Sequence, residues 1–409
     1  MSQNTGVLGG SVRYSPYDYA VHEDPYPFYA RLRTEAPLYH NEDLGFWALS
    51  RHADVSMGFR DSARFSSAEG VSLDKLASGP QAHKTMSFLA MDPPRHTRMR
   101  SLVARGFTPR RVVEMEPRIR EMAERYLDRA RELSADGAEF DIISDFAGRL
   151  PMDVISDMMG VPVEDRDEIR RLADLLVHRE EGVEDVPPAG IEAAISLFGY
   201  YSDMIAQRRR TPTEDLTSAL LVAEIDGDRL TDEDIVAFLF LMVVAGNETT
   251  TKLLGHCLYW AWRNPDERAK VWSGSHTVEQ WIEETLRYDT SSQMLARVTT
   301  TDVELHGGVI PAGDRVVLLV GSANRDPDVF DDPDRYDIGR DTSQIVSFGL
   351  GRHFCMGASL ARLEARVSLE EWVKRFGSYD IDADGVRRVH SINVRGFASL
   401  PTTLDWRQG

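Results

Sequence analysis

Cys355 lies in a tight loop that constrains what this chain can fold into more than any other segment. Gly351 and Gly357 flank the cysteine, and the adjoining stretch Ala358–Trp372 has the pattern of a helix. Glycines let the backbone turn closely around the sulfur. N–H groups at the start of the helix point toward it and favour its thiolate form. The loop is therefore suited to holding a metal through one thiolate rather than to forming a disulfide.

Composition is that of an ordinary globular protein. The chain has 409 residues, with 42% hydrophobic and 28% charged residues, and a net charge of −19 that argues against nucleic acid as a partner. It has two cysteines, which provide no disulfide framework, and we expect Cys257 to be a buried core residue. Met1–Gly6 lacks the features of a signal peptide, so we expect a cytoplasmic protein. Arginines far outnumber lysines, which hints at a bacterial source.

The pattern along the chain predicts a mainly α protein with small β-sheets. No repeat or linker divides it, so we expect one domain over residues 1–409, with residues 1–24 as an N-terminal extension. Apolar spacing of three and four predicts helices over Met115–Leu133, Ile169–Val177, Ile191–Ile205 and Leu216–Val222. Short strands are expected at Gly45–Leu49, Val303–Leu305, Arg315–Leu319 and Ser391–Val394.

The longest predicted helix starts after Thr231, which begins a capping box with Asp234, and runs to Arg263. Its unbroken apolar part, Ile235–Gly246, has about twelve residues, whereas a membrane span needs roughly 20. We therefore expect a buried central helix and no membrane partner.

The middle of this helix carries Ala245, Gly246, Glu248 and Thr249. An acid and a hydroxyl inside an apolar helix need partners, because burying either alone costs several kcal/mol. A threonine can hydrogen-bond to a carbonyl one turn earlier. Gly246 leaves room for a small molecule beside the helix. Taken alone, the segment could equally be a satisfied polar kink without chemistry.

The spacing Phe-x-x-Gly-x-x-x-Cys-x-Gly, from Phe348 to Gly357, resembles the haem-ligand loop of the cytochromes P450. The resemblance implies haem b, with Cys355 as the axial ligand and Phe348, Gly351 and Gly357 beside it. It also implies that the haem is buried between a long distal helix and the proximal cysteine loop. In this family, positions matching Ala245, Gly246, Glu248 and Thr249 form the oxygen-binding groove and deliver protons to dioxygen.

Other residues gain a role from the same resemblance. His96, Arg100, Arg297 and His353 match positions that bind the haem propionates. Glu284 and Arg287, three residues apart on one predicted helix, match a charged pair that Arg335 completes as a buried triad. The expected role of this triad is structural, and a buried pair of this kind is costly to break.

The resemblance implies a monooxygenase that oxidises a lipophilic small molecule with O2 and two electrons. The substrate class could be a steroid, terpenoid, polyketide or drug-like xenobiotic. We expect its pocket to include Leu241, Val244, Met294 and Phe397. The chain has no Gly-x-Gly-x-x-Gly nucleotide loop and no room for a redox domain, so a ferredoxin and its NAD(P)H-dependent reductase are the expected donors.

Arginines cluster near Pro93–Val113 and around the cysteine loop, at Arg352, Arg362 and Arg366. They predict a basic face that could steer an acidic electron donor, although some of them must serve propionates and helix ends. Two alternative functions stay open. One is a haem-based ligand-binding protein without turnover. The other is a haem-thiolate enzyme that uses peroxide or isomerises its substrate. The acid–alcohol pair Glu248 and Thr249 argues against both.

Overall fold

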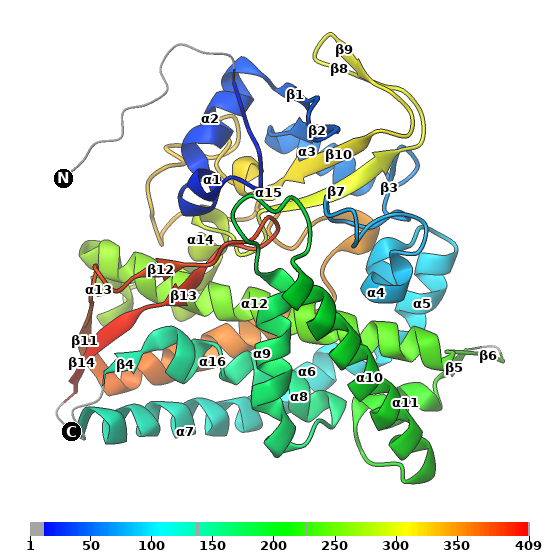
Figure 1. Ribbon diagram of the computed structural model, residues 1–409. Helices are drawn as coiled ribbons and strands as arrows, with labels where there is room; N and C mark the ends of the chain where they lie inside the picture. Colours follow the sequence, from blue (N-terminus) through cyan, green and yellow to red (C-terminus); the bar gives the residue numbers. More distant parts are fainter. Residues whose placement is uncertain (1–11, 136–138, 226, 408–409) are drawn as a thin grey trace.

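The computed structural model describes residues 12–135, 139–225 and 227–407 (Figure 1). Its α-helices are α1 (Tyr19–Glu23), α2 (Tyr26–Glu35), α3 (His52–Arg60), α4 (His83–Met86), α5 (Arg95–Val103), α6 (Pro109–Glu114), α7 (Glu116–Ala135), α8 (Leu150–Met159), α9 (Arg166–Val177), α10 (Pro188–Arg210), α11 (Leu216–Leu221), α12 (Asp232–Arg263), α13 (Pro265–Trp272), α14 (Val278–Tyr288), α15 (Val320–Ala323) and α16 (Ala358–Arg375). Short helical turns lie at Ser87–Ala90, Ala104–Phe107, Ile142–Ala147, Val163–Asp165 and Gly351–His353.

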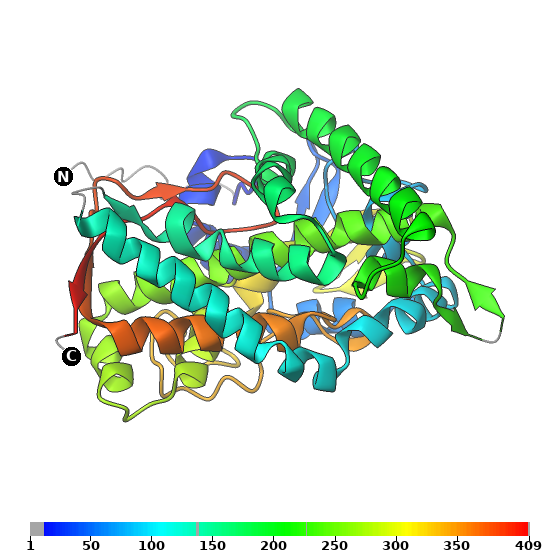
Figure 2. The ribbon, with the colours of Figure 1, turned by 90° about the horizontal axis from the view of Figure 1, so that it is seen from below.

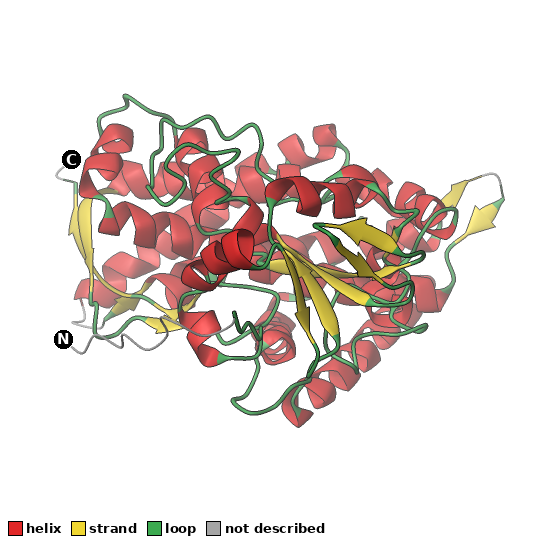
Figure 3. Ribbon diagram, turned by 90° about the horizontal axis from the view of Figure 1, so that it is seen from above, coloured by secondary structure: helices red, strands yellow, loops and turns green. Residues whose placement is uncertain are grey.

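The strands are short. They are β1 (Leu38–Asn41), β2 (Phe46–Leu49), β3 (Phe65–Ser66), β4 (Phe140–Asp141), β5 (Glu224–Ile225), β6 (Asp228–Arg229), β7 (Met294–Thr299), β8 (Val303–Leu305), β9 (Gly308–Ile310), β10 (Arg315–Leu319), β11 (Phe376–Ile381), β12 (Arg387–Arg388), β13 (Phe397–Ser399) and β14 (Pro401–Trp406). The largest sheet has the order β1-β2-β10-β7-β3, and a second has the order β11-β14-β4. Figure 3 shows the five-stranded sheet beside the helical part of the molecule.

Helix α12 runs through the centre of the helical part and contacts α8, α9, α10, α14 and α16 (Figures 1 and 2). The predicted capping box is present: Thr231 and Asp234 each accept a hydrogen bond from the other's backbone N–H. The helix ends at Arg263, before Asn264–Pro265, where proline cannot continue it. Residues 235–243 are all buried, as expected for a core helix.

Length and composition alone would allow α12 to cross a membrane, but 72% of its most apolar 18-residue window is buried inside the protein. The core helix of a folded protein can satisfy the same length and hydropathy criteria as a membrane-spanning helix. The prediction of a buried central helix is thus confirmed.

Most predicted elements are confirmed within a few residues, including the strands at 303–305 and 315–319. The predicted strand Ser391–Val394 is wrong, because this segment makes only an isolated bridge between Val394 and Ser292. The predicted N-terminal extension lies outside the described residues for positions 1–11. Its remaining part packs on the sheet through Tyr14 and Val21, both of which are buried.

Candidate active site

A cleft of about 240 Å³ lies between α12, the cysteine loop, β7 and the region of α5. Its walls are mostly apolar. The residues that line it include Phe88, Leu89, Arg100, Leu241, Ala245, Gly246, Thr249, Leu295, Arg297, Phe348, His353, Cys355 and Glu364. These residues come from segments that are distant in the sequence. The fold therefore brings together most of the positions that the sequence singled out.

Cys355 presents an accessible thiol to this cleft although it lies deep in the molecule. Its backbone N–H donates to the Phe348 carbonyl oxygen at 2.9 Å, which closes the loop around the sulfur. Burial raises the pKa of the Cys355 thiol, whereas the Gly357 N–H group and the Arg100 guanidinium lower it in part. The predicted help from backbone N–H groups is present but does not outweigh burial. A metal ion bonded to the sulfur would complete the stabilisation of the thiolate.

Four basic side chains gather beside the cysteine. His96 lies against His353, with ring centroids 4.2 Å apart. Arg100 donates to the Phe354 carbonyl oxygen at 2.6 Å, and Arg297 is only 2% exposed. Within the described residues, both ring nitrogens of each histidine and one terminal nitrogen of Arg100 are buried without a hydrogen-bond partner.

Burial and the nearby positive charges both lower the pKa values of basic groups in this cluster. Burial lowers the pKa of His96 to about 4, and Arg100 and Arg352 contribute to the same shift. Burial also lowers the pKa of Arg297 to about 10. Buried donors that lack partners are costly in a folded protein, so this arrangement calls for an anionic ligand.

This donor set fits a porphyrin with two propionates. The cleft offers an apolar space beside Phe348, a sulfur for the metal, and four basic groups on one side. Gly351 has a φ of +67°, and a Cβ there would lie 3.1 Å from the Phe59 carbonyl oxygen, so only glycine suits this turn. His96, Arg100, Arg297 and His353 are thus brought together as the sequence predicted.

Ala245, Gly246 and Thr249 line the cleft on α12, below Leu241. The Thr249 hydroxyl donates to the Ala245 carbonyl oxygen at 2.8 Å, which is the predicted bond to the preceding turn. Glu248 does not line the cleft. Its carboxylate is 1% exposed and forms an ion pair with Lys252 at 3.0 Å.

The predicted triad needs a correction. Glu284 and Arg287 form a fully buried bidentate pair, with both N–O distances at 2.8 Å. Arg335 does not join them: its side chain is 63% exposed and pairs with Asp337 at 2.6 Å. Arg340 takes the third place instead, with its Nε 3.5 Å from Glu284 and its side chain 9% exposed.

The physical reason for this shift lies in the turn after Phe330. Arg335 contributes only its backbone carbonyl oxygen, which accepts hydrogen bonds from Arg287 and Arg340. Its side chain therefore points outward. Arg335 and Arg340 lie in the same irregular segment, which contains proline and several aspartates. Neither helix nor strand periodicity there indicates which arginine side chain points into the protein.

Three of the four predicted pocket residues are not on the cleft. Met294 faces the opposite side of β7 and contacts the Tyr14 hydroxyl, because neighbouring strand residues point to opposite faces. Leu295 lines the cleft in its place. Phe397 packs on Tyr259 at a centroid distance of 4.4 Å, and Val244 lies off the α12 stripe that faces the cleft. Only Leu241 is placed as predicted.

Sequence reasoning missed Glu364 as a cleft residue. Burial raises the pKa of Glu364 well above its ordinary range, and one of its carboxyl oxygens lacks a partner within the described part of the chain. An acid at a helical position that faces inward was the available signal, since Glu364 lies two turns after Gly357 on α16.

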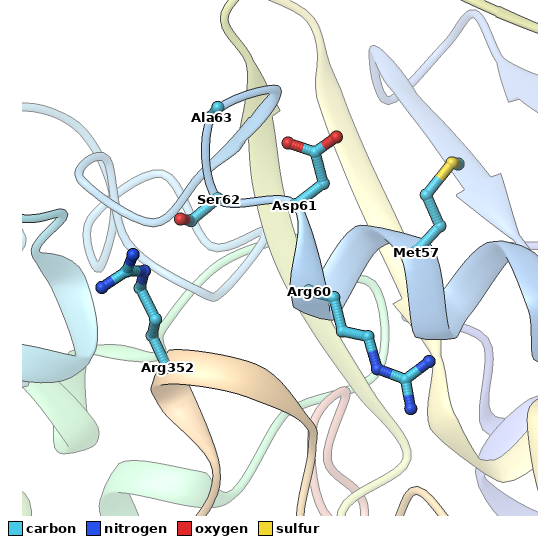
Figure 4. Close-up of a pocket in the computed structure, with 6 residues that line it drawn as sticks. All are labelled: Met57, Arg60, Asp61, Ser62, Ala63 and Arg352. Atoms are coloured by element: carbon cyan, nitrogen blue, oxygen red, sulfur yellow. The ribbon is translucent and has the colours of Figure 1, made fainter.

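Several arginines of the predicted basic face are paired with acids. Arg362 pairs with Glu283 at 2.5 Å, and Arg366 pairs with Glu116 and Glu370 at 2.6 and 2.9 Å. Two exposed arginines flank a shallow hollow beside the cysteine loop. Figure 4 shows Arg352 facing the loop of Ser62 and Ala63, with Arg60 at the end of α3.

Comparisons with known proteins point the same way. The profile of the family described as Cytochrome P450 matches residues 191–388. The chain is 57% identical over 393 residues to the putative cytochrome P450 123 of Mycobacterium tuberculosis, covering 96% of this chain and 97% of that protein. It is 39% identical to the vitamin D(3) 25-hydroxylase of Pseudonocardia autotrophica, over 94% of this chain and 95% of the relative.

A solved structure is similar as well. The cytochrome P450 CYP109Q5 from Chondromyces apiculatus superimposes with a TM-score of 0.85 at 36% identity, covering 96% of this chain and 98% of that one. The similarity therefore extends over nearly the whole chain in both sequence and fold.

Proposed function

This chain belongs to the cytochrome P450 family and is a P450 monooxygenase, and we propose that it oxidises a lipophilic small molecule with electrons from a ferredoxin. The observation that carries the proposal is the placement of the Cys355 sulfur in an apolar cleft beside four basic groups, three of which have buried nitrogens without a hydrogen-bond partner within the described residues. We further propose that residues 1–409 act as one cytoplasmic domain.

The family implies a haem-thiolate cofactor, and we propose that this cofactor is haem b. Cys355 would hold its iron, while His96, Arg100, Arg297 and His353 would bind its propionates. Once bound, it would supply the site for dioxygen activation and for electron uptake. Partnering with two carboxylates would also stabilise charged His96 and His353, whose burial now favours their neutral forms.

The residues of α12 would manage water and protons beside the cofactor. Thr249 keeps its hydroxyl at the edge of the cleft while it donates to Ala245, so its oxygen can accept a hydrogen bond from water or substrate-side oxygen. Gly246 lines the groove, and a Cβ there would lie 3.2 Å from Ile155, so glycine allows α12 to pack closely against this side chain. Glu248 would supply protons from behind this groove.

The lining supports a lipophilic substrate. Phe88, Leu89, Leu241 and Leu295 present apolar surface, with the hydroxyls of Ser291 and Ser292 as polar points. A relative in this family is named a vitamin D(3) 25-hydroxylase. We therefore propose a rigid, mostly apolar substrate of the steroid or related kind, carrying one or two polar groups.

The electron donor would dock near the cysteine loop. Arg60 and Arg352 are exposed there, and neither has an ion-pair partner among the residues that the structure describes. Arg362 and Arg366, the other two arginines near the loop, are paired with acids. The steering charge would thus be concentrated at the hollow of Figure 4, which suits an acidic partner such as a ferredoxin.

A titration with a panel of lipophiles, followed at the haem absorption band, tests the substrate proposal. Binding should displace water and shift the spin state, and the bound compounds should give oxidised product with a ferredoxin and its NAD(P)H-dependent reductase. NADPH consumption without any product would favour the ligand-binding alternative. Turnover supported by peroxide but not by the reductase would favour the peroxide-using alternative.

A further inference from the structure

A second pocket, of about 500 Å³, lies outside the cleft, between α4, α10 and the first turns of α12. Both α4 and α10 contact α12, and Figure 1 shows them near the end where α12 begins. None of the described residues lines both the pocket and the cleft. The two adjoin at the turn Ser87–Ala90, where Ser87 lines the pocket and Phe88 lines the cleft. The volume is in the range of small-molecule sites.

Part of the pocket lining is apolar. Phe198 and Ile205 come from α10, and Val236 and Ala237 come from α12. Ile205, Val236 and Ala237 are buried, whereas Phe198 is half-buried. Two adjacent helices therefore offer a continuous surface on which an alkyl chain would be shielded from water.

Ser87 combines two unfavourable features at this pocket. Its backbone has a φ of +48° and a ψ of −135°, in a region that residues other than glycine rarely adopt. Its hydroxyl oxygen is buried and has no hydrogen-bond partner among the described residues. Glycine would avoid both features. A buried hydroxyl without a partner in a strained turn is thus suited to a hydrogen bond with a ligand.

Two cations that line the pocket also lack partners. Lys84 and Arg95 are exposed, and neither side chain forms an ion pair or a hydrogen bond within the part of the chain that the structure describes. Lys84 lies three residues before Ser87. His83 lines the pocket as well, and it is neutral near pH 7 because burial and the charge of Arg95 lower its pKa. This side of the pocket therefore carries positive charge that no acid neutralises.

The first turn of α12 contributes three acids to the lining. Asp232 is ion-paired with Arg209, and Asp234 accepts a hydrogen bond from the Thr231 backbone N–H at 3.1 Å. Of the three, only Glu233 forms no ion pair or hydrogen bond through its side chain among the described residues. Two cations and one anion are thus left without partners. This balance favours a ligand with one negative charge over a ligand with two.

We propose that this pocket is a second binding site, for an amphiphilic carboxylate such as a fatty acid. The carboxylate lies at Ser87, Lys84 and Arg95, and the alkyl chain lies on the apolar surface of α10 and α12. Lysine and arginine bind carboxylates through charge-assisted hydrogen bonds, and a serine hydroxyl can donate to a carboxylate oxygen. The site goes beyond the proposed function, because its ligand binds outside the cleft and is not the molecule that is oxidised.

The first test separates the pocket from the cleft. The holoenzyme is saturated with an azole inhibitor, whose nitrogen binds haem iron and keeps the cleft occupied, and dodecanoate is then titrated by calorimetry at about pH 8. One dodecanoate should still bind. Dodecan-1-ol and dodecyl phosphate, which is a dianion at this pH, should bind at least about 10-fold more weakly. Loss of all dodecanoate binding in the presence of the azole would overturn the proposal, as would equal binding of the alcohol.

The second test uses variants in the same titration. Ser87→Gly should lower the affinity for dodecanoate about 10-fold, as expected for one hydrogen bond to a charged group, and should raise the Tm because it removes the strain and the buried hydroxyl. Lys84→Gln should also weaken binding, whereas Glu233→Gln should strengthen it. Lys75→Gln, a matched change of an exposed lysine outside the pocket, should have no effect.

Azole binding should be the same in all four variants, which shows that the cleft is intact. Wild-type affinity for dodecanoate in both Ser87→Gly and Lys84→Gln would refute the site.

Discussion

At the scale of single residues, two arginines five positions apart have opposite roles. Arg340 is enclosed beside Glu284 and donates to the carbonyl oxygens of Asp332 and Arg335 at 3.0 and 3.2 Å. Arg335 is exposed and pairs only with neighbouring aspartates. Without Arg340, Glu284 would keep Arg287 as a cation but lose its second one, and two backbone carbonyl oxygens would lose their donor. The cost should therefore differ sharply between the two positions.

Arg340→Ala should lower the free energy of unfolding by roughly 3 kcal/mol, and it should reduce haem incorporation because the segment before the cysteine loop loosens. Arg335→Ala should change the free energy of unfolding by less than about 1 kcal/mol. Urea denaturation of both variants and the ratio of haem to protein measure the difference. Equal losses in the two variants would contradict the assignment of Arg340 to the buried network.

At the scale of elements, a buried ion pair joins two loops at one end of the helical part. Asp74, from the segment after β3, and Arg179, from the segment after α9, lie 2.6 Å apart and are almost fully buried. Arg179 also receives a link to the C-terminal part, since its N–H donates to the His390 carbonyl oxygen at 2.8 Å. These contacts hold both loops closed over the molecule.

Asp74→Asn should leave Arg179 buried without its counter-ion and weaken this closure by roughly 3 kcal/mol. Amide hydrogen exchange over residues 67–82 and 178–187 should then accelerate about 100-fold relative to the wild type. Asp61→Asn is the matched control, because its partner Arg64 is 42% exposed and the pair contributes little. Similar exchange in both variants would show that the pair does not hold the loops.

The elements themselves were largely predictable. Helix α12 was found from its capping box and apolar run, and β8 and β10 from short alternating segments between glycine-rich turns. The cleft residues Cys355, Arg297 and Thr249 were found because a motif fixed their spacing. Met294, Phe397 and Arg335 were misplaced because the direction of a side chain in a loop or short strand depends on packing partners distant in sequence.

At the scale of the whole molecule, buried titratable groups should make stability depend on pH. Burial lowers the pKa of His256 to about 3, and it lowers that of His22 to about 4. Both histidines take up a proton near pH 6.5 in the unfolded chain but stay neutral in the folded one. Because the unfolded state then binds more protons, stability must fall as the pH falls below about 6.5.

The free energy of unfolding of the haem-free protein should therefore decrease by about 1.4 kcal/mol per pH unit for each such histidine between roughly pH 6.5 and 4. Burial raises the pKa of Asp289, but Arg395, His256 and Arg388 outweigh it and keep it well below its ordinary range, so this carboxylate adds a further loss below about pH 4. Urea titrations at a series of pH values measure the slope. His256→Asn should flatten it, and an unchanged slope would contradict the neutral burial of this ring.

The central claim is that the Cys355 thiolate binds haem iron, and the carbon monoxide spectrum of the reduced protein tests it most directly. The wild type should show the red-shifted band of a thiolate-ligated haem. Cys257→Ser should keep this band, because Cys257 is buried in α12. Cys355→Ser should lose it. A red-shifted band that persists in Cys355→Ser would contradict the account.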